Sequence, residues 1–114
     1  MVAIAEVAPL VGVSMGEEDL ALLVKADAGD PEAQDDMGQF FLAVGKHVAA
    51  RYWLEQAALQ EHPNAMQCLG RCYLEGDIVE RDDNFAIMWI AKAAAHGHAI
   101  AQAQVQALIG QGRR

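Results

Sequence analysis

The sequence predicts an all-α fold, a short solenoid of about six antiparallel helices. The main evidence is an internal repeat: one pattern of small and aromatic residues occurs twice, and a third copy begins at Ala95 and stops halfway. The chain is 54% hydrophobic but only 6% aromatic, which favours closely packed helices, and no stretch shows the period-two alternation of a β-strand. A repeat of this length is typical of stacked helical pairs, whose usual product is a binding surface. The matching positions are Ala33, Gly38, Phe41, Trp53, Ala57 and Ala58 in the first copy, Ala65, Gly70, Tyr73, Trp89, Ala93 and Ala94 in the second, and Ala101 in the third.

Capping residues and glycines mark the helix ends in the first half of the chain. Ser14 and Glu17 have the spacing of a capping box and predict a helix over 17–28, ended by Gly29. Asp30 as N-cap and Pro31 at the first helical position predict a helix over 31–43. A tight turn then leads to a third helix over 48–60.

The second half is marked in the same way. Pro63 opens a helix over 63–74, which Gly76 closes. The loop 76–82 leads to a helix over 83–96, ended by Gly97, and the last helix covers 99–110. We therefore divide the chain into an N-terminal apolar segment (1–13), a solenoid (14–110) and a polar tail (111–114).

Two kinds of helix alternate. We name 31–43, 63–74 and 99–110 the A helices and 48–60 and 83–96 the B helices; the helix over 17–28 is an extra B helix without an A partner. Gly38 and Gly70 lie within A helices, where glycine costs about 1 kcal/mol relative to alanine, so we expect each to allow a B helix to approach closely. Gln106 replaces this glycine in the third copy, where we expect it to face water as a cap.

The two copies differ in the loop between the A and B helices. Fifteen residues separate Gly38 from Trp53, whereas 19 separate Gly70 from Trp89. The longer second copy resembles the Sel-one-like repeat family, relatives of the tetratricopeptide repeat, in residues 65–73, 76–82 and 86–94 and in the A-H-G that follows. The resemblance covers residues 17–109, about 2.5 repeats. It implies a right-handed αα-superhelix that serves as a non-enzymatic protein-protein interaction module, an adaptor or scaffold.

The resemblance also implies that the A helices line the concave surface. Positions opposite the core side of these helices are the predicted partner-binding residues. They change from acidic in the first copy, through neutral, to apolar in the third, which matches a partner peptide or helix with basic residues at one end and an apolar anchor at the other. These residues are Glu32, Asp35, Gln39, Asn64, Gln67, Arg71, Ile100, Ala103 and Ala107.

The charge of the chain limits its partners. The net charge is −8, and residues 1–61 carry eleven acids and three bases, whereas residues 62–114 carry five of each. Because an acidic surface repels phosphate, we expect no nucleic-acid partner. No stretch reaches 18 apolar residues, so we expect no membrane insertion and a cytoplasmic location.

The N-terminal apolar segment, residues 1–13, has no basic start and is interrupted by Glu6 and Pro9, unlike a signal peptide. Two uses stay open for it: filling the groove of its own chain, or forming a homodimer. An exposed end of the solenoid is a second route to a homodimer.

Cys68 and Cys72, together with His62 or with His96 and His98, are the only residues that suggest metal ligation. The two cysteines lie one helical turn apart, which suits a disulfide poorly. We expect them to be small buried apolar residues, and we predict no metal site and no cofactor.

The sequence contains no nucleophile elbow, phosphate loop or carboxylate pair, so no catalytic residue is predicted and the chain is not expected to be an enzyme. The alternative to an adaptor is a small acidic chaperone or regulatory subunit for a secreted or motility protein.

Overall fold

The computed structural model describes the backbone of residues 16–112 and the side chains of residues 16–110. No strand occurs among these residues, and the prediction of an all-α solenoid is confirmed. The helices match the expected ranges closely. They are α2 (Glu17–Asp27), α3 (Pro31–Ala43), α4 (His47–Leu59), α5 (Pro63–Glu75), α6 (Asp83–Ala95) and α7 (Ala99–Gly112).

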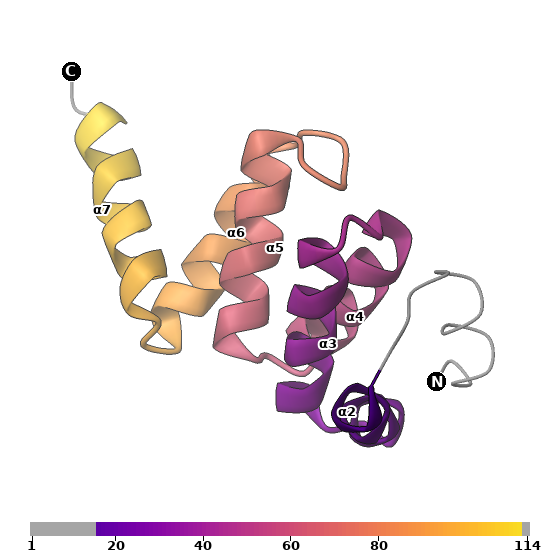
Figure 1. Ribbon diagram of the computed structural model, residues 1–114. Coiled ribbons are helices and arrows are strands. Elements are labelled where there is room, and N and C mark those ends of the chain that lie inside the picture. The colour runs from indigo at the N-terminus through magenta and orange to yellow at the C-terminus, as the bar shows by residue number, and fades with distance from the viewer. Residues whose placement is uncertain (1–15, 113–114) are drawn as a thin grey trace.

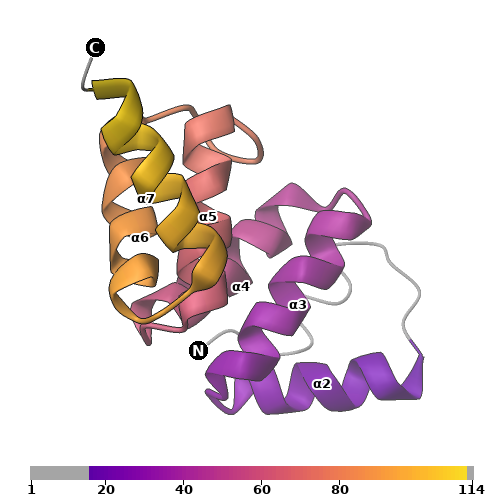
Figure 2. The ribbon, with the colours of Figure 1, turned by 90° about the vertical axis from the view of Figure 1, so that its left-hand side faces the viewer.

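The helices stack as successive antiparallel pairs in an elongated molecule of 51 × 24 × 20 Å. Figure 1 shows α3 and α5 toward the viewer, α4 and α6 behind them, and α7 at the end of the row. The second view shows α7 lying across α6 and α5, and α2 crossing the foot of α3 (Figure 2). The A helices α3 and α5 therefore share one side of the solenoid, and α7 lies beside them at its C-terminal end.

Side-chain caps begin four of the helices. Asp30 accepts hydrogen bonds from the backbone N–H groups of Glu32 and Ala33, at 3.0 and 3.2 Å, and Asp82 accepts one from Phe85 at 3.0 Å. Nδ1 of His62 accepts from Ala65 N–H at 3.4 Å, and Nδ1 of His98 accepts from Ala101 N–H at 3.2 Å. Three repeats therefore start their A helix at equivalent caps, namely Asp30, His62 and His98.

The predicted cap of the first helix was wrong. Its N-cap is Gly16, whose N–H donates to Oδ2 of Asp19 at 3.2 Å. Glu17 is consequently the first helical residue and does not stand at the third position that a capping box from Ser14 requires.

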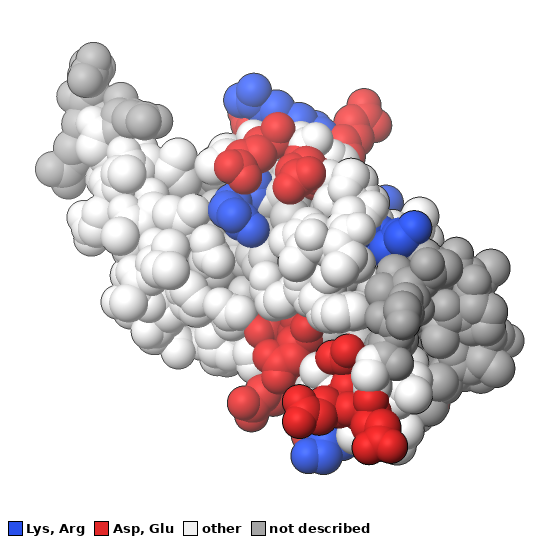
Figure 3. Space-filling model, viewed as in Figure 1, with Lys and Arg blue, Asp and Glu red and all other residues white. Residues whose placement is uncertain are grey.

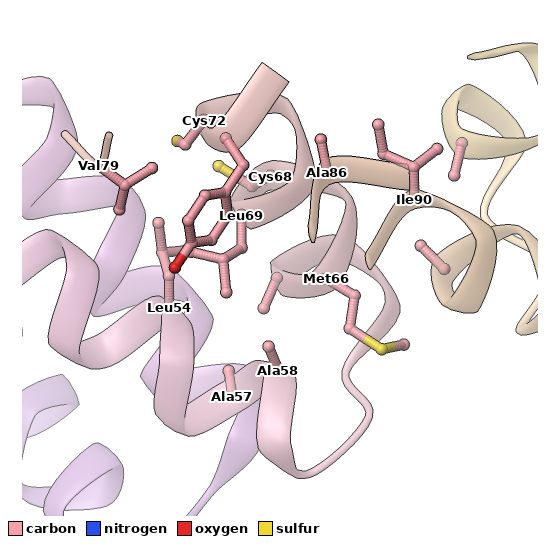
Figure 4. Packing of buried hydrophobic residues seen from close by; sticks show 14 residues of the cluster. Leu54, Ala57, Ala58, Met66, Cys68, Leu69, Cys72, Val79, Ala86 and Ile90 are labelled. Atoms are coloured by element: carbon pink, nitrogen blue, oxygen red, sulfur yellow. The ribbon is translucent and has the colours of Figure 1, made fainter. Parts of the chain in front are cut away.

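Among residues 16–110, the core consists of two clusters of buried side chains, one between α2, α3 and α4 and one extending from α4 to α7. The first includes Leu23, Phe41 and Trp53. The second extends from Leu54 through Leu69 to Ala101 (Figure 4). The repeat residues named from the sequence are all buried except Trp89 and Ala94, which are half-buried near the C-terminal end of the stack.

The long loop of the second repeat joins the two clusters. Val79 is 8% exposed and packs in the second cluster, while Ile78 packs against both. The first repeat has only the short turn around Gly45, so the loop between α5 and α6 covers the boundary between repeats.

The predicted domain boundaries lie at residues 13 and 110. Residues 1–13 and Ser14 lie outside the described residues, so the N-terminal segment stays a prediction. The helix α7 continues to Gly112, so the predicted boundary at residue 110 falls inside a helix.

Candidate protein-binding face

A polar depression lies on the A-helix side, between α5 and α7. Its volume is about 340 Å³. Because it lies beside neighbouring A helices, it can hold a segment of another chain across the repeats. The lining residues are Gln39, Asn64, Gln67, Cys68, Arg71, Ile100 and Gln104.

Hydrogen bonds between repeats run along this side of the molecule. Nδ2 of Asn64 donates to Oδ2 of Asp35 at 2.8 Å, and Nε2 of Gln39 donates to the other oxygen of Asp35 at 3.4 Å. Nε2 of His98 and Oδ1 of Asn64 lie 3.2 Å apart. One polar network therefore links α3 to the start of α5 and to the turn before α7.

A second bond crosses from α5 to α7. Nε2 of Gln67 donates to Oε1 of Gln104 at 3.2 Å. These bonds occupy Asp35 and Gln67, which are only 4% and 8% exposed. Both residues hold adjacent repeats together, and a ligand in the groove reaches them only by replacing those bonds.

The other predicted site residues have different surroundings. Gln39 is half-buried, and the remaining six are exposed. The exposed side chains are thus acidic on α3, polar on α5 and apolar on α7. The exposed six are Glu32, Asn64, Arg71, Ile100, Ala103 and Ala107.

Asp36 is a candidate residue that the sequence analysis missed. It is exposed, and it occupies the repeat position of Cys68 and Gln104, both of which line the depression. Its pKa is raised, first by partial burial and then by the charges of Asp35 and Glu32. Aligning the three repeats at Ala33, Ala65 and Ala101 would have identified Asp36 from the sequence, since each matching residue follows three positions later. Acidic side chains gather near the lower end of α3 in the space-filling view (Figure 3).

Arg71 and two thiols form a small cluster on α5. Nη2 of Arg71 lies 3.6 Å from Sγ of Cys68. Hydrogen bonding to Cys72 is the main cause that lowers the pKa of Cys68, with smaller contributions from Gln39 and Arg71. The pKa of Cys72 is raised by the same bond and by burial. Both cysteines are free and buried, as the sequence suggested.

The histidines considered as metal ligands serve other purposes. His62 and His98 cap helices through Nδ1, and His96 pairs with Glu61 at 3.3 Å. Within residues 16–110 no three His, Cys, Asp or Glu side chains are arranged to hold a metal ion. No helix in the same part of the chain has the length and apolar character needed to cross a bilayer.

Two further depressions flank the loop between α5 and α6. One, of about 310 Å³, is lined by residues that include Val48, Tyr52 and Ile78, and the other, of about 480 Å³, by residues that include Phe85 and Arg81. The arginines that line them are paired: Arg51 with Glu55 at 3.3 Å, and Arg81 with Asp83 at 3.0 Å. These cations are therefore less available to a ligand than Arg71 is.

Comparison with known families decides the identity of the repeat. The Sel1 repeat model matches residues 31–62 and 63–98, more than half of the chain. This chain belongs to the Sel1 repeat family. Sel1 repeat proteins generally mediate protein–protein interaction, and their repeats are typically non-catalytic scaffolds.

Solved structures of Sel1 repeat proteins have the same fold. The chain is similar to a Sel1 repeat protein from Oxalobacter formigenes, with 28% identity and a TM-score of 0.78, over 85% of this chain and 76% of that one. It is also similar to a protective antigen present in uropathogenic Escherichia coli strains that displays an SLR fold, with 27% identity and a TM-score of 0.78. That match covers 87% of this chain but only 22% of the antigen. No curated protein matched the sequence.

Proposed function

We propose that this Sel1 repeat chain binds one segment of a partner protein, an extended peptide or a helix, along the side formed by α3, α5 and α7. The observation that carries the proposal is the order of exposed side chains on these helices. Glu32 and Asp36 lie on α3, Arg71 lies on α5, and Ile100 lies 60% exposed on α7. The partner segment would carry basic residues toward α3 and an apolar side chain toward α7.

The carboxamides between these ends suit a peptide backbone. Asn64, Gln67 and Gln104 line the depression, and each carboxamide can both donate and accept. They supply sequence-independent bonds, whereas the charged and apolar ends supply selectivity. Gln67 is bonded to Gln104 and Asn64 to Asp35, so a peptide backbone has to replace these bonds or use the donors and acceptors that they leave free.

A random peptide library tests this proposal. We expect peptides selected on the wild-type chain to carry Lys or Arg at one end and a large apolar residue at the other. Replacing Glu32 and Asp36 together by lysine should weaken such a peptide about tenfold, equal to about 1.4 kcal/mol. The matched control replaces Asp77 and Glu80, which lie in the exposed loop, by lysine and leaves affinity unchanged.

Two results would count against this face. One is a selected set of peptides without a charge bias. The other is an equal loss of peptide affinity in the two double variants, because the Asp77 and Glu80 pair can act only through the net charge of the chain. Fluorescence anisotropy at low and high salt measures both affinities.

Several large apolar side chains are exposed, which supports the alternative of a small acidic chaperone. Val48, Leu59 and Ile100 are 88%, 70% and 60% exposed. A chaperone of this kind is expected to self-associate without its client, whereas an adaptor is expected to be a stable monomer. Light scattering on the full chain distinguishes the chaperone from the adaptor by its mass in solution. The same measurement on a variant lacking residues 1–13 tests a homodimer formed through that segment.

A further inference from the structure

His98, in the turn between α6 and α7, is bonded through both nitrogens of its imidazole ring. Nε2 lies 3.2 Å from Oδ1 of Asn64 at the start of α5. Nδ1 accepts from the backbone N–H of Ala101 at 3.2 Å and so caps α7. Among the described residues these are the only hydrogen bonds of this side chain, and together they join the last helix to the rest of the stack.

The bond from Asn64 to Asp35 decides which nitrogen of His98 carries the proton. An ionised carboxylate only accepts hydrogen bonds, so the atom of Asn64 that lies 2.8 Å from Oδ2 of Asp35 is its NH₂ nitrogen. The amide oxygen is therefore the atom that faces His98, and Nε2 of the imidazole donates to it. The remaining nitrogen, Nδ1, keeps the lone pair that the N–H of Ala101 needs. The neutral Nε2–H form of His98 thus links α3, through α5, to the first turn of α7.

A second proton on this imidazole breaks the cap of α7. It can bind only at Nδ1, where it displaces the N–H of Ala101. It also places a positive charge at the N-terminus of a helix, where the helix dipole favours negative charge. No acidic residue occurs in α7, which covers Ala99–Gly112. Since imidazole is the side chain that ordinarily changes charge between pH 5 and 8, mild acid is the condition that matters here.

The charged and titratable groups around this turn are engaged with other partners. Glu61, from the turn between α4 and α5, pairs with His96 at 3.3 Å. Lys92, in the last turn of α6, lies over a tryptophan ring at 5.6 Å. Asp35 is bonded to the far side of Asn64. Within residues 16–110, therefore, no carboxylate contacts the imidazole of His98 to stabilise a charge on it.

The equivalent caps of the other two repeats differ in this respect. Asp30 caps α3 with a carboxylate, which gains no positive charge in acid. His62 caps α5 at the longer distance of 3.4 Å, and it lies close enough to the carboxylate of Asp36 for their charges to interact. Only the cap of α7 combines an imidazole with a helix that has no charged residue. We therefore expect α7, at the end of the row in Figure 1, to respond most to acid.

We propose that protonation of His98 releases the first turn of α7 from α5 and so opens the apolar end of the binding face. Ile100 and Gln104, which line the depression, lie on the released helix, and Gln104 is bonded to Gln67 of α5. The released imidazole takes up a proton that the docked one excludes, so docking is complete at neutral pH and weakens as the pH falls. The effect on a bound partner rests on the proposed function, whereas the release of α7 does not.

Hydrogen exchange of the full-length chain at about pH 7.5 and about pH 5.5 tests the release of α7. After correction for intrinsic exchange rates, the protection of the α7 amides should fall about tenfold in wild type, since loss of a cap costs about 0.5–2 kcal/mol and tenfold corresponds to about 1.4 kcal/mol. His98→Asn keeps a capping oxygen without a titrating group and should keep its protection in acid. The matched control, His96→Gln, removes an imidazole from the same turn without touching the cap and should still lose protection.

Nitrogen NMR of the wild-type chain needs no variant and should show the Nε2–H form of His98 at neutral pH. The amide signal of Ala101 should then shift with the same midpoint as the His98 ring. The proposal is overturned by an Nδ1–H form, by unchanged protection of α7 in acid, or by an equal loss in wild type and His98→Asn.

Peptide affinity separates this proposal from the proposed function. Protonation of Glu32 and Asp36 weakens a basic peptide equally in both proteins, so any further loss in wild type relative to His98→Asn reports α7. If α7 is released in acid but the two proteins bind the selected peptides equally, the release stands and the proposed location of the peptide on α7 fails.

Discussion

Gly70 and Ile90 lie so close that a β-carbon on Gly70 would be 2.7 Å from Cγ1 of Ile90. The same atom would be 3.0 Å from the carbonyl oxygen of Ala86 and 3.1 Å from the backbone nitrogen of Ile90. In the first repeat, a β-carbon on Gly38 would lie 2.7 Å from side-chain atoms of Leu54 and 3.2 Å from its nitrogen. Each glycine is thus the contact point between an A helix and its B helix.

Gly70→Ala should destabilise the protein despite the better helix propensity of alanine. The gain in propensity is about 1 kcal/mol, but the new methyl group meets backbone atoms of α6, and overpacking costs about 1–3 kcal/mol. Gly38→Ala should cost less, since the side chain of Leu54 can rotate away. Urea denaturation measures both. Gly110→Ala, which meets nothing within 4 Å, is the control, and a loss there equal to that of Gly70→Ala would contradict the packing argument.

Glu61→Gly should stabilise the protein relative to Glu61→Ala by about 1 kcal/mol. Glu61 has a φ of 61° in the turn between α4 and α5, where the other inter-repeat turns have Gly29 and Gly97 at φ of 104° and 87°. A left-handed conformation costs a non-glycine residue about 1–2 kcal/mol. Both variants lose the contact with His96, so the difference between their thermal unfolding temperatures reports the cost of the backbone conformation at residue 61. Equal stability of the two would show that this turn is not strained.

Gln34→Ala should destabilise the chain by about 1–3 kcal/mol, the usual cost of lost buried hydrogen bonds. Nε2 of Gln34 donates to the carbonyl of Ala26 at 3.0 Å, and Oε1 accepts from Gln60 at 2.8 Å. Gln34→Met should cost less because the second repeat has the fully buried Met66 at this place. Chemical denaturation compares them, and a methionine variant as unstable as the alanine variant would argue that the bonds, rather than the volume, matter most.

Asp36→Asn should raise stability at neutral pH by up to about 0.5 kcal/mol, the range usual for surface positions. The pKa of Asp36 is raised in the folded state, so the folded chain holds this proton more tightly than the unfolded chain does. The ionised carboxylate therefore opposes folding, and this penalty disappears as the pH falls through the folded pKa. Melting temperatures of the variant and wild type should converge in acid. A constant difference at all pH values would exclude the electrostatic cause.

Much of the helical layout could be predicted because its signals are local. The caps at Asp30 and Asp82, the prolines at the helix starts and the glycines at the ends all act within one turn of helix. The repeated glycines also predicted which helices would touch. The candidate face was less predictable: Asp35 and Gln67 share a helical phase with exposed residues, yet they are buried because the next repeat covers them.

By itself, the sequence determined the number of helices within residues 16–112, their alternation in two kinds and their Sel1 repeat character, since these depend on residue spacing along one chain. The tertiary structure alone decided which polar side chains bond across repeats and which stay exposed. It also brought Gln39, Arg71 and Gln104, from three helices, around Cys68. The physical reason is that burial and hydrogen bonding between repeats depend on neighbours more than 25 residues away, as in the bonds from Asn64 to Asp35 and from Gln67 to Gln104.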